Sequence, residues 1–208
     1  MVTALAIIAV ASVATAATTS AQPRPGAPSP AATAPSALPP VAFRCAAEGV
    51  AIQVSNGQML TDQASLGPDP GDPTLCRWKR GFTTTETYFG LVGRTTTDGL
   101  PELRAGLQDL FSGRRTEFTV RKSALAVGGQ RNEYDDTWKC LPDAVITVAG
   151  RTINTVVFQN TPRALTFPSS SFQTLWYDPA LGIWVKRDVV VHPGNRWGEP
   201  WEVVKITQ

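Results

Sequence analysis

Beyond residue 41 the chain alternates between apolar and polar residues in short stretches that are separated by turn residues. Such alternation places every second side chain on one face of a β-strand. The stretches with this pattern are 50–54, 75–78, 83–92, 115–121, 134–140, 145–149, 152–159, 172–177, 183–191 and 201–207. Many short strands joined by turns predict a mainly β fold, an antiparallel curved sheet or barrel-like meander.

One stretch has a different period and predicts a helix over about 100–112. Five apolar residues recur at the spacing of one helix face, namely Leu100, Leu103, Leu107, Leu110 and Phe111. Asp98 or Gly99 can cap the start, Pro101 suits the first turn, and Gly113 ends the helix. We expect this single short helix to lie across the sheet.

Turn residues divide the strands. Asn56-Gly57, Gly128-Gly129 and Gly150-Arg151 are hairpin-type turns. The run 67–73, rich in Gly, Pro and Asp, predicts a rigid loop.

The hairpin over 174–187 is the most informative part of the chain. Asp178-Pro179 opens its turn, because Asp accepts a backbone hydrogen bond and Pro fixes φ at the next position. Gly182 supplies the positive φ that returns the chain to the ladder at a bulge.

Large aromatic rings flank this turn. Trp176 and Trp184 lie on either side of it, and Tyr177 faces away from Trp176. These rings either fill the core or form a stacking platform for a sugar, glycan or peptide. Trp176, Tyr177 and Trp184 are therefore our candidate ligand-binding residues.

The first forty residues differ from the rest. Residues 2–17 are apolar or small and precede small-residue cleavage sites, which predicts a signal peptide over 1–21, although no Lys or Arg comes before the run. The run is shorter than the ~20 residues of a membrane span, so we expect no stable transmembrane anchor, the alternative being an uncleaved one. Residues 22–40, rich in Pro and Ala, predict a disordered linker, and 41–208 a single β-rich domain. The expected location is periplasmic or secreted.

Three cysteines lie in the predicted domain: Cys45, Cys76 and Cys140. In an oxidising compartment two should pair and one should remain. Our preferred bridge is Cys45–Cys76, and Cys76–Cys140 is the alternative. Cysteine spacing and a single histidine, His192, give no zinc site, and we predict no metal and no cofactor.

The charge is too mild to indicate a nucleic-acid partner, since the net charge is +2 and the pI is about 8.5. Basic residues gather at 77–80, 114–122 and 186–187, and we interpret them as solvated faces of strands.

Catalytic chemistry is hard to find. His192 lies where a strand runs into a turn, and the chain has no Gly-x-Ser-x-Gly elbow. Asp135 and Asp136 would point to opposite faces of a strand, whereas Glu133 and Asp135 would share one. We assign no catalytic residue and favour a non-enzyme.

The order of parts resembles uncharacterised bacterial envelope proteins of unknown function. The matching residues are Leu110-Phe111, Gly113, Trp138, Ile146–Gly150, Leu175–Pro179, Gly182 and Val185–Arg187. They cover about the C-terminal half, Leu100 to Arg187, and depart at Ser112, where that family often has Pro. The resemblance implies an exported β protein and brings no catalytic residues.

Together these features favour a non-catalytic envelope protein that acts as a binding or structural module. A concave sheet crossed by a helix could hold an apolar ligand such as a lipid or acyl chain. The alternatives are a glycan-binding module, a small glycan-active hydrolase that uses Glu133 or Asp135, and a module that docks an envelope protein through Trp197 and Trp201.

Overall fold

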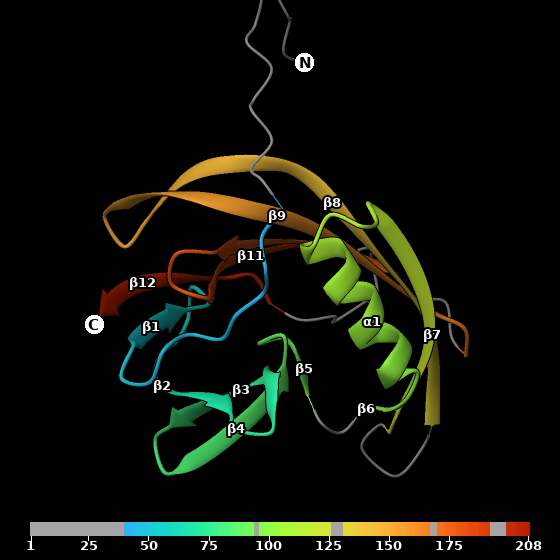
Figure 1. The fold of residues 1–208 in the computed structure, drawn as a ribbon, viewed down its shortest axis with the longest axis horizontal. Helices are drawn as coiled ribbons and strands as arrows, with labels where there is room; N and C mark the ends of the chain where they lie inside the picture. Colours follow the sequence, from blue (N-terminus) through green and yellow to red (C-terminus); the bar gives the residue numbers. More distant parts are fainter. Residues whose placement is uncertain (1–39, 94–95, 126–130, 167–169, 192–198) are drawn as a thin grey trace, which may run out of the picture. The chain divides into compact units, whose positions relative to one another are not determined.

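Twelve strands pair into one antiparallel sheet in the part of the chain that the computed structural model describes, residues 40–93, 96–125, 131–166, 170–191 and 199–208. The strand order is β5-β4-β3-β2-β1-β12-β11-β10-β9-β8-β7-β6 (Figure 1). The strands are β1 (Ala51–Ser55), β2 (Leu60–Asp69), β3 (Asp72–Arg80), β4 (Thr83–Tyr88), β5 (Val92–Gly93), β6 (Thr96–Asp98), β7 (Glu117–Leu125), β8 (Arg131–Val148), β9 (Arg151–Ala164), β10 (Ser171–Asp178), β11 (Ile183–Val191) and β12 (Trp201–Thr207). The predicted mainly β, antiparallel fold is confirmed.

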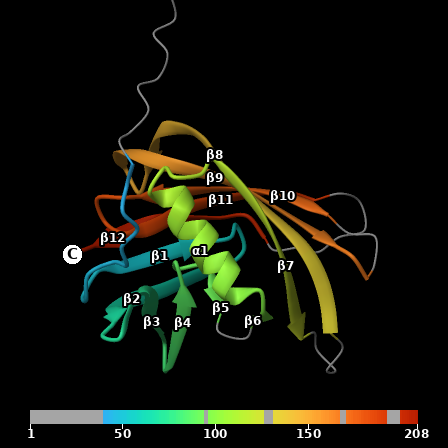
Figure 2. The same ribbon diagram turned by 45° about the vertical axis from the view of Figure 1, so that its right-hand side comes forward.

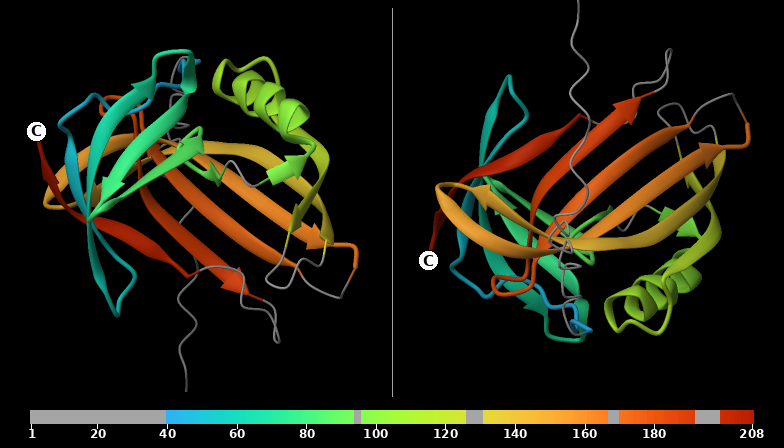
Figure 3. Two further views of the ribbon diagram at one scale, coloured as in Figure 1. Left: turned by 90° about the horizontal axis from the view of Figure 1, so that it is seen from below. Right: turned by 90° about the horizontal axis from the view of Figure 1, so that it is seen from above.

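The sheet is strongly curved and does not close. β5 and β6 are at opposite ends of the strand order, yet they are consecutive in the sequence, ending at Gly93 and starting at Thr96. Three residue steps span at most about 11 Å, so the two end strands must come close together. The sheet therefore curls around a concave side, on which the helix lies (Figures 1 and 3).

The predicted helix is present as α1, Leu100–Phe111, which starts after Gly99 in a left-handed conformation (φ 72). Leu103, Leu107, Leu110 and Phe111 are buried on the concave side, as the spacing predicted. At Gly106 the helix approaches β7 so closely that a Cβ atom there would lie 2.4 Å from the ring of Phe118. A residue without a side chain is therefore needed at this contact.

Phe111 is at the centre of the main core. Its ring packs 4.7 Å from that of Phe158 and 5.1 Å from those of Phe43 and Tyr177. It also has an edge contact with Trp184 at 6.1 Å. Because these rings come from the helix, the segment before β1, and β9, β10 and β11, one aromatic cluster holds all these parts together.

A second buried cluster lies where β11 and β12 meet β1. Ile183, Val185 and Val203 form its centre, and the end of the β8–β9 hairpin adds Val148. Figure 3 shows this long hairpin reaching toward the C-terminal strand. Figure 2 shows β1 beside β12, where Ala51 pairs with Thr207 and so joins the first and last strands.

Three predicted hairpins are confirmed. β1 and β2 pair on either side of Asn56-Gly57, with Ser55 opposite Leu60. Between β8 and β9 the turn residues are Ala149 and Gly150, one position before the predicted pair Gly150-Arg151, and their φ values of 51° and 72° are those that a two-residue hairpin turn requires. In the turn between β10 and β11, Asp178 Oδ1 accepts hydrogen bonds from the backbone N–H groups of Ala180 and Leu181, and Gly182 has φ 72. The predicted turn at Gly128-Gly129 lies outside the described residues.

The predicted loop at 67–73 is wrong. β2 runs to Asp69 and β3 begins at Asp72, so a tight turn is all that separates them. β1 pairs with β2 over Leu60 to Ala64, which leaves the far half of β2 without that neighbour. Pro68 is tolerated there because it sits at a free strand edge next to register shifts.

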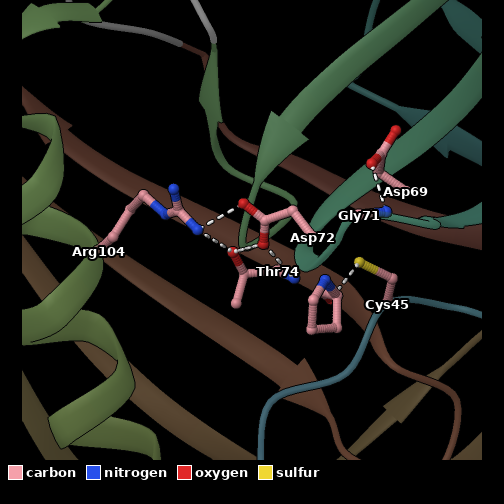
Figure 4. A network of polar contacts seen from close by, with 7 residues as sticks. Cys45, Asp69, Gly71, Asp72, Thr74 and Arg104 are labelled. Atoms are coloured by element: carbon pink, nitrogen blue, oxygen red, sulfur yellow. Dashed lines mark hydrogen bonds and ion pairs between the residues drawn. The ribbon is translucent and has the colours of Figure 1, made fainter.

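A polar contact joins the helix to β3 (Figure 4). Arg104 of α1 donates to Asp72 Oδ2 at 2.5 Å and to Thr74 Oγ1 at 3.2 Å. Its guanidinium also lies 4.5 Å from the ring centroid of Tyr88. Burial acts to raise the pKa of Asp72, but hydrogen bonds from Thr74 and the charge of Arg104 together lower it. The helix thus bridges the two ends of the curved sheet.

The segment before β1 is fixed to the rest by a disulfide and by backbone contacts. Cys45 and Cys76 form the preferred bridge, and Cys140 is a free, half-buried thiol. Burial, with a smaller contribution from Asp143, raises the pKa of Cys140.

Within the described residues there is no helix of the length and apolar character that crossing a bilayer demands.

The hydroxyl of Tyr177 holds the same segment. It donates to the carbonyl of Arg44 at 2.7 Å and accepts from the backbone N–H of Arg44 at 3.1 Å. The side chain is fully buried. Burial raises the pKa of Tyr177 to about 12.

Removing the disulfide should destabilise the fold. The bridge closes a loop with a sequence separation of 31, for which chain entropy predicts a loss of about 3–4 kcal/mol. We expect the double variant Cys45→Ala/Cys76→Ala to unfold at clearly lower urea concentration than Cys140→Ala, the matched control. Equal midpoints for the two variants would contradict this prediction.

Stability should fall at high pH because of Tyr177. The neutral hydroxyl is favoured in the fold, so its contribution is complete below the ordinary pKa of 10.0 and is lost as the pH rises to about 12. The loss is about 2–3 kcal/mol. At neutral pH, Tyr177→Phe should lower the free energy of unfolding by about 1–3 kcal/mol, because Arg44 loses two hydrogen bonds. Between pH 10 and 12, the free energy of unfolding of this variant should fall less steeply than that of the parent protein. Urea unfolding from neutral pH to pH 12 measures both effects. If the free energies of unfolding of the two proteins fall in parallel between pH 10 and 12, the loss of stability does not come from Tyr177.

Candidate binding cleft

A cavity of about 520 Å³ opens between the first strands and the last strands of the sheet. One wall is made by β1, β2, β3 and β4, and the other by β11 and β12. Phe43, Gly90 and Leu91 close one side. We call this cavity the cleft. Its volume lies within the range of small-molecule sites, which is roughly 300–1,000 Å³.

The first wall is built from alternating positions. The residues that line it are Ile52, Val54, Thr61, Gln63, Cys76, Trp78, Arg80, Thr85 and Thr87. Within each strand they are two residues apart, so they share one face of the sheet. The register agrees, because Val54 pairs with Thr61 and Trp78 pairs with Thr85. The pleat of four neighbouring strands therefore creates this surface.

Three indole rings border the cleft. Trp184 is buried, and its N–H donates to the carbonyl of Phe89 at 2.7 Å. Trp78 and Trp201 are half-buried and line the cleft from opposite walls. Neither of their N–H groups has a hydrogen-bond partner among the described residues. Within the described part of the chain, both rings thus offer an apolar face and an N–H donor that no protein group occupies.

The lining of the cleft also includes polar side chains. Thr61, Gln63 and Thr87 line the cleft and have no hydrogen-bond partner within the described part of the chain. Asn56 donates to Glu199 Oε2 at 2.6 Å. Water can satisfy such groups in an open cleft, but an apolar ligand could not.

Arg187 was missed by sequence analysis. The basic pair at 186–187 was interpreted as part of a solvated strand face, and this interpretation is wrong for Arg187. Its side chain lines the cleft, opposite Trp201 on β12 and Leu175 on β10. Its Nε atom is buried without a hydrogen-bond partner, and burial lowers the pKa of Arg187. Lys186 lies 5.0 Å from the ring centroid of Trp176 and pairs with Asp188.

A register shift explains why the pattern hid Arg187. Between Trp176 and Tyr177 the β10–β11 pairing shifts, so that Trp176 pairs with Lys186 while Tyr177 pairs with Trp184. The extra residue, Val185, lets both Trp184 and Arg187 line the cleft although they are three residues apart. Simple alternation would have placed them on opposite faces.

Of the three candidate ligand-binding residues, Trp184 lines the cleft. Tyr177 is fully buried in the aromatic core and its hydroxyl is occupied by Arg44. Trp176 packs against the second cluster. The structure thus brings Trp184 and Tyr177 together in the core, with ring centroids 5.2 Å apart, and separates Trp176 from them. A binding role for these residues stays a prediction.

The acidic residues of β8 lie away from the cleft. Asp136 is fully buried and accepts hydrogen bonds from Lys122 at 2.5 Å, Trp138 at 3.1 Å and Asn160 at 2.7 Å. Asp135 pairs with Arg121 at 3.0 Å. β8 contributes no described residue to the cleft.

Other candidate chemistry is limited. Among the described residues, no three Cys, His, Asp or Glu side chains gather as metal ligands would. His192 and Trp197 lie outside the described residues. Glu199 is the one carboxylate among the described residues that line the cleft.

Comparison with known proteins gives a partial likeness in structure. No protein-family model matches the chain, and no curated protein matches it in sequence. The crystal structure of the hypothetical lipoprotein YmcC from Escherichia coli (K12) superposes with a TM-score of 0.49 and 12% sequence identity, over 81% of this chain and 88% of that one. A likeness at this level says nothing about what this chain binds or where it works.

Proposed function

We propose that this chain is an exported, non-catalytic module that binds a saccharide in the cleft. The observation that carries the proposal is the lining itself: the half-buried rings of Trp78 and Trp201, together with polar side chains that have no hydrogen-bond partner among the described residues. Sugar rings have apolar C–H faces and hydroxyl edges. They therefore suit a surface on which aromatic faces and hydrogen-bonding groups alternate.

An acyl chain suits this lining less well. It would cover Thr61, Gln63 and Thr87 without offering hydrogen bonds. Each polar group left in this way would cost about 1–3 kcal/mol of binding free energy. Saccharide hydroxyls can offer these groups the hydrogen bonds that an acyl chain cannot. The polar lining thus favours the glycan alternative over a lipid or acyl chain.

Binding is also better supported than hydrolysis. Glycoside hydrolysis generally uses two carboxyl groups on either side of the scissile bond. Glu199 is the one acid among the described residues of the cleft, and it already accepts a hydrogen bond from Asn56. Glu133 and Asp135 are on β8, outside the cleft.

Export rests on two independent features. A disulfide joins Cys45 and Cys76, and such bridges persist in oxidising compartments. The apolar run with small-residue cleavage sites at the N-terminus agrees with secretion. A periplasmic or secreted location follows as part of the proposal.

The test is a panel of soluble oligosaccharides, neutral and uronic, together with peptidoglycan fragments, followed by tryptophan fluorescence and calorimetry. We expect at least one member to bind, and Trp201→Ala and Trp78→Ala each to weaken binding about tenfold, because each removes roughly 1.4 kcal/mol of ring contact. Trp176→Ala is the matched control, because Trp176 packs against the second cluster as Trp78 and Trp201 do, but does not line the cleft.

Two results would count against the proposal. One is the absence of any fluorescence or heat change with every saccharide in the panel. The other is stoichiometric co-purification of a lipid, seen by native mass spectrometry, that Trp201→Ala abolishes.

A further inference from the structure

Among the described residues that line the cleft, Arg187 is the half-buried cation, and no described side chain supplies a counter-charge. No described carboxylate pairs with it, and its Nε atom has no hydrogen-bond partner. Its cross-strand neighbours, Leu175 and Trp201, are apolar side chains. Such a position is unfavourable for a charge, because a guanidinium taken out of water needs compensation by an anion or by hydrogen bonds.

Other half-buried cations of the described residues have a protein partner. Arg77 also has a buried Nε atom without a hydrogen-bond partner, but its Nη2 donates to the carbonyl of Leu66 at 3.1 Å. Lys122 pairs with the buried Asp136, Arg104 with Asp72, and Lys186 with Asp188 and the ring of Trp176. Arg187 differs from them in that it faces a cavity of about 520 Å³ rather than a protein group. An arginine cannot relieve its burial by losing its proton at ordinary pH.

We infer that the cleft binds an acidic saccharide, whose carboxylate or other anionic group is recognised by the guanidinium of Arg187 while a neighbouring sugar ring stacks on Trp201. This inference rests on the proposed function and adds the charge of the ligand. Arg187 and Trp201 are directly paired across β11 and β12, so an anion and the sugar ring that carries it can contact both side chains at once. The planar guanidinium also matches a carboxylate with two parallel hydrogen bonds.

The second arginine of the cleft, Arg80, is exposed at the end of β3 and serves as a control. Its removal lowers the net charge by the same amount as removal of Arg187. Water screens an exposed cation, so general attraction of an anion depends on both residues, whereas direct recognition depends on Arg187 alone.

The experiment compares oligogalacturonate with its fully methyl-esterified form, which has the same rings and no charge. Calorimetry should show the acid binding roughly 10- to 100-fold more tightly than the ester to the unaltered protein, the range expected for charge-assisted hydrogen bonds. Arg187→Gln should abolish this preference, so that the acid and the ester bind about equally tightly. Arg80→Gln should keep most of the preference. Arg187→Gln should be at least as stable to urea as the parent, because an uncompensated buried charge is removed.

Each other outcome decides against the inference in a distinct way. Equal binding of acid and ester, with Trp201 still required, overturns the acidic assignment and leaves saccharide binding standing. A preference that follows Arg80 overturns the role of Arg187. Binding of neither form, with no binding in the neutral panel, removes the proposed function as well. Laurate is tested as well, because a fatty acid also carries a carboxylate. If laurate binds in an Arg187-dependent way and oligogalacturonate does not bind, the ligand is not a saccharide.

Discussion

The short connection between β5 and β6 is the constraint on which the rest of the structure depends. These two strands end a twelve-stranded order, and two residues separate them. A flat sheet could not satisfy this connection, so the sheet must curl and acquire a concave interior. The helix that follows β6 directly is then delivered into that interior, where its apolar face replaces water. Curvature, helix placement and the aromatic core are thus consequences of one covalent restraint.

Much of this architecture could be predicted because local sequence patterns determine the helix and the turns. The period of Leu100 to Phe111 gives the helix, and turn residues such as Gly150 and Asp178 give the hairpins. The Cys45–Cys76 bridge was preferred because it closes a local excursion of the chain. The exception, the run 67–73, shows the limit of turn chemistry. Proline there reflects a free strand edge rather than a loop, and strand neighbours are not visible in a single segment.

The cleft could not be predicted for a related reason. Its two walls come from opposite ends of the domain sequence, and they meet because β12 pairs with β1. Neither Trp78 nor Trp201 has a local signal that connects it with the other. Arg187 could not be predicted for two reasons. The adjacent lysine suggested a solvated face, and the bulge at Val185 changes the face of the sheet on which the following residues lie.

The position of β12 also bears on how the molecule forms. As the last strand of the sequence it lies between β1 and β11, and it is the seam that joins the five N-terminal strands to the six strands β6 to β11. During synthesis both groups of strands can emerge and fold locally before their shared neighbour exists. Assembly of the finished sheet is therefore a late, long-range event of the kind that slows folding. The cleft, which takes its walls from both sides of this seam, is completed in the same step, so the ligand site comes into being when the whole domain does.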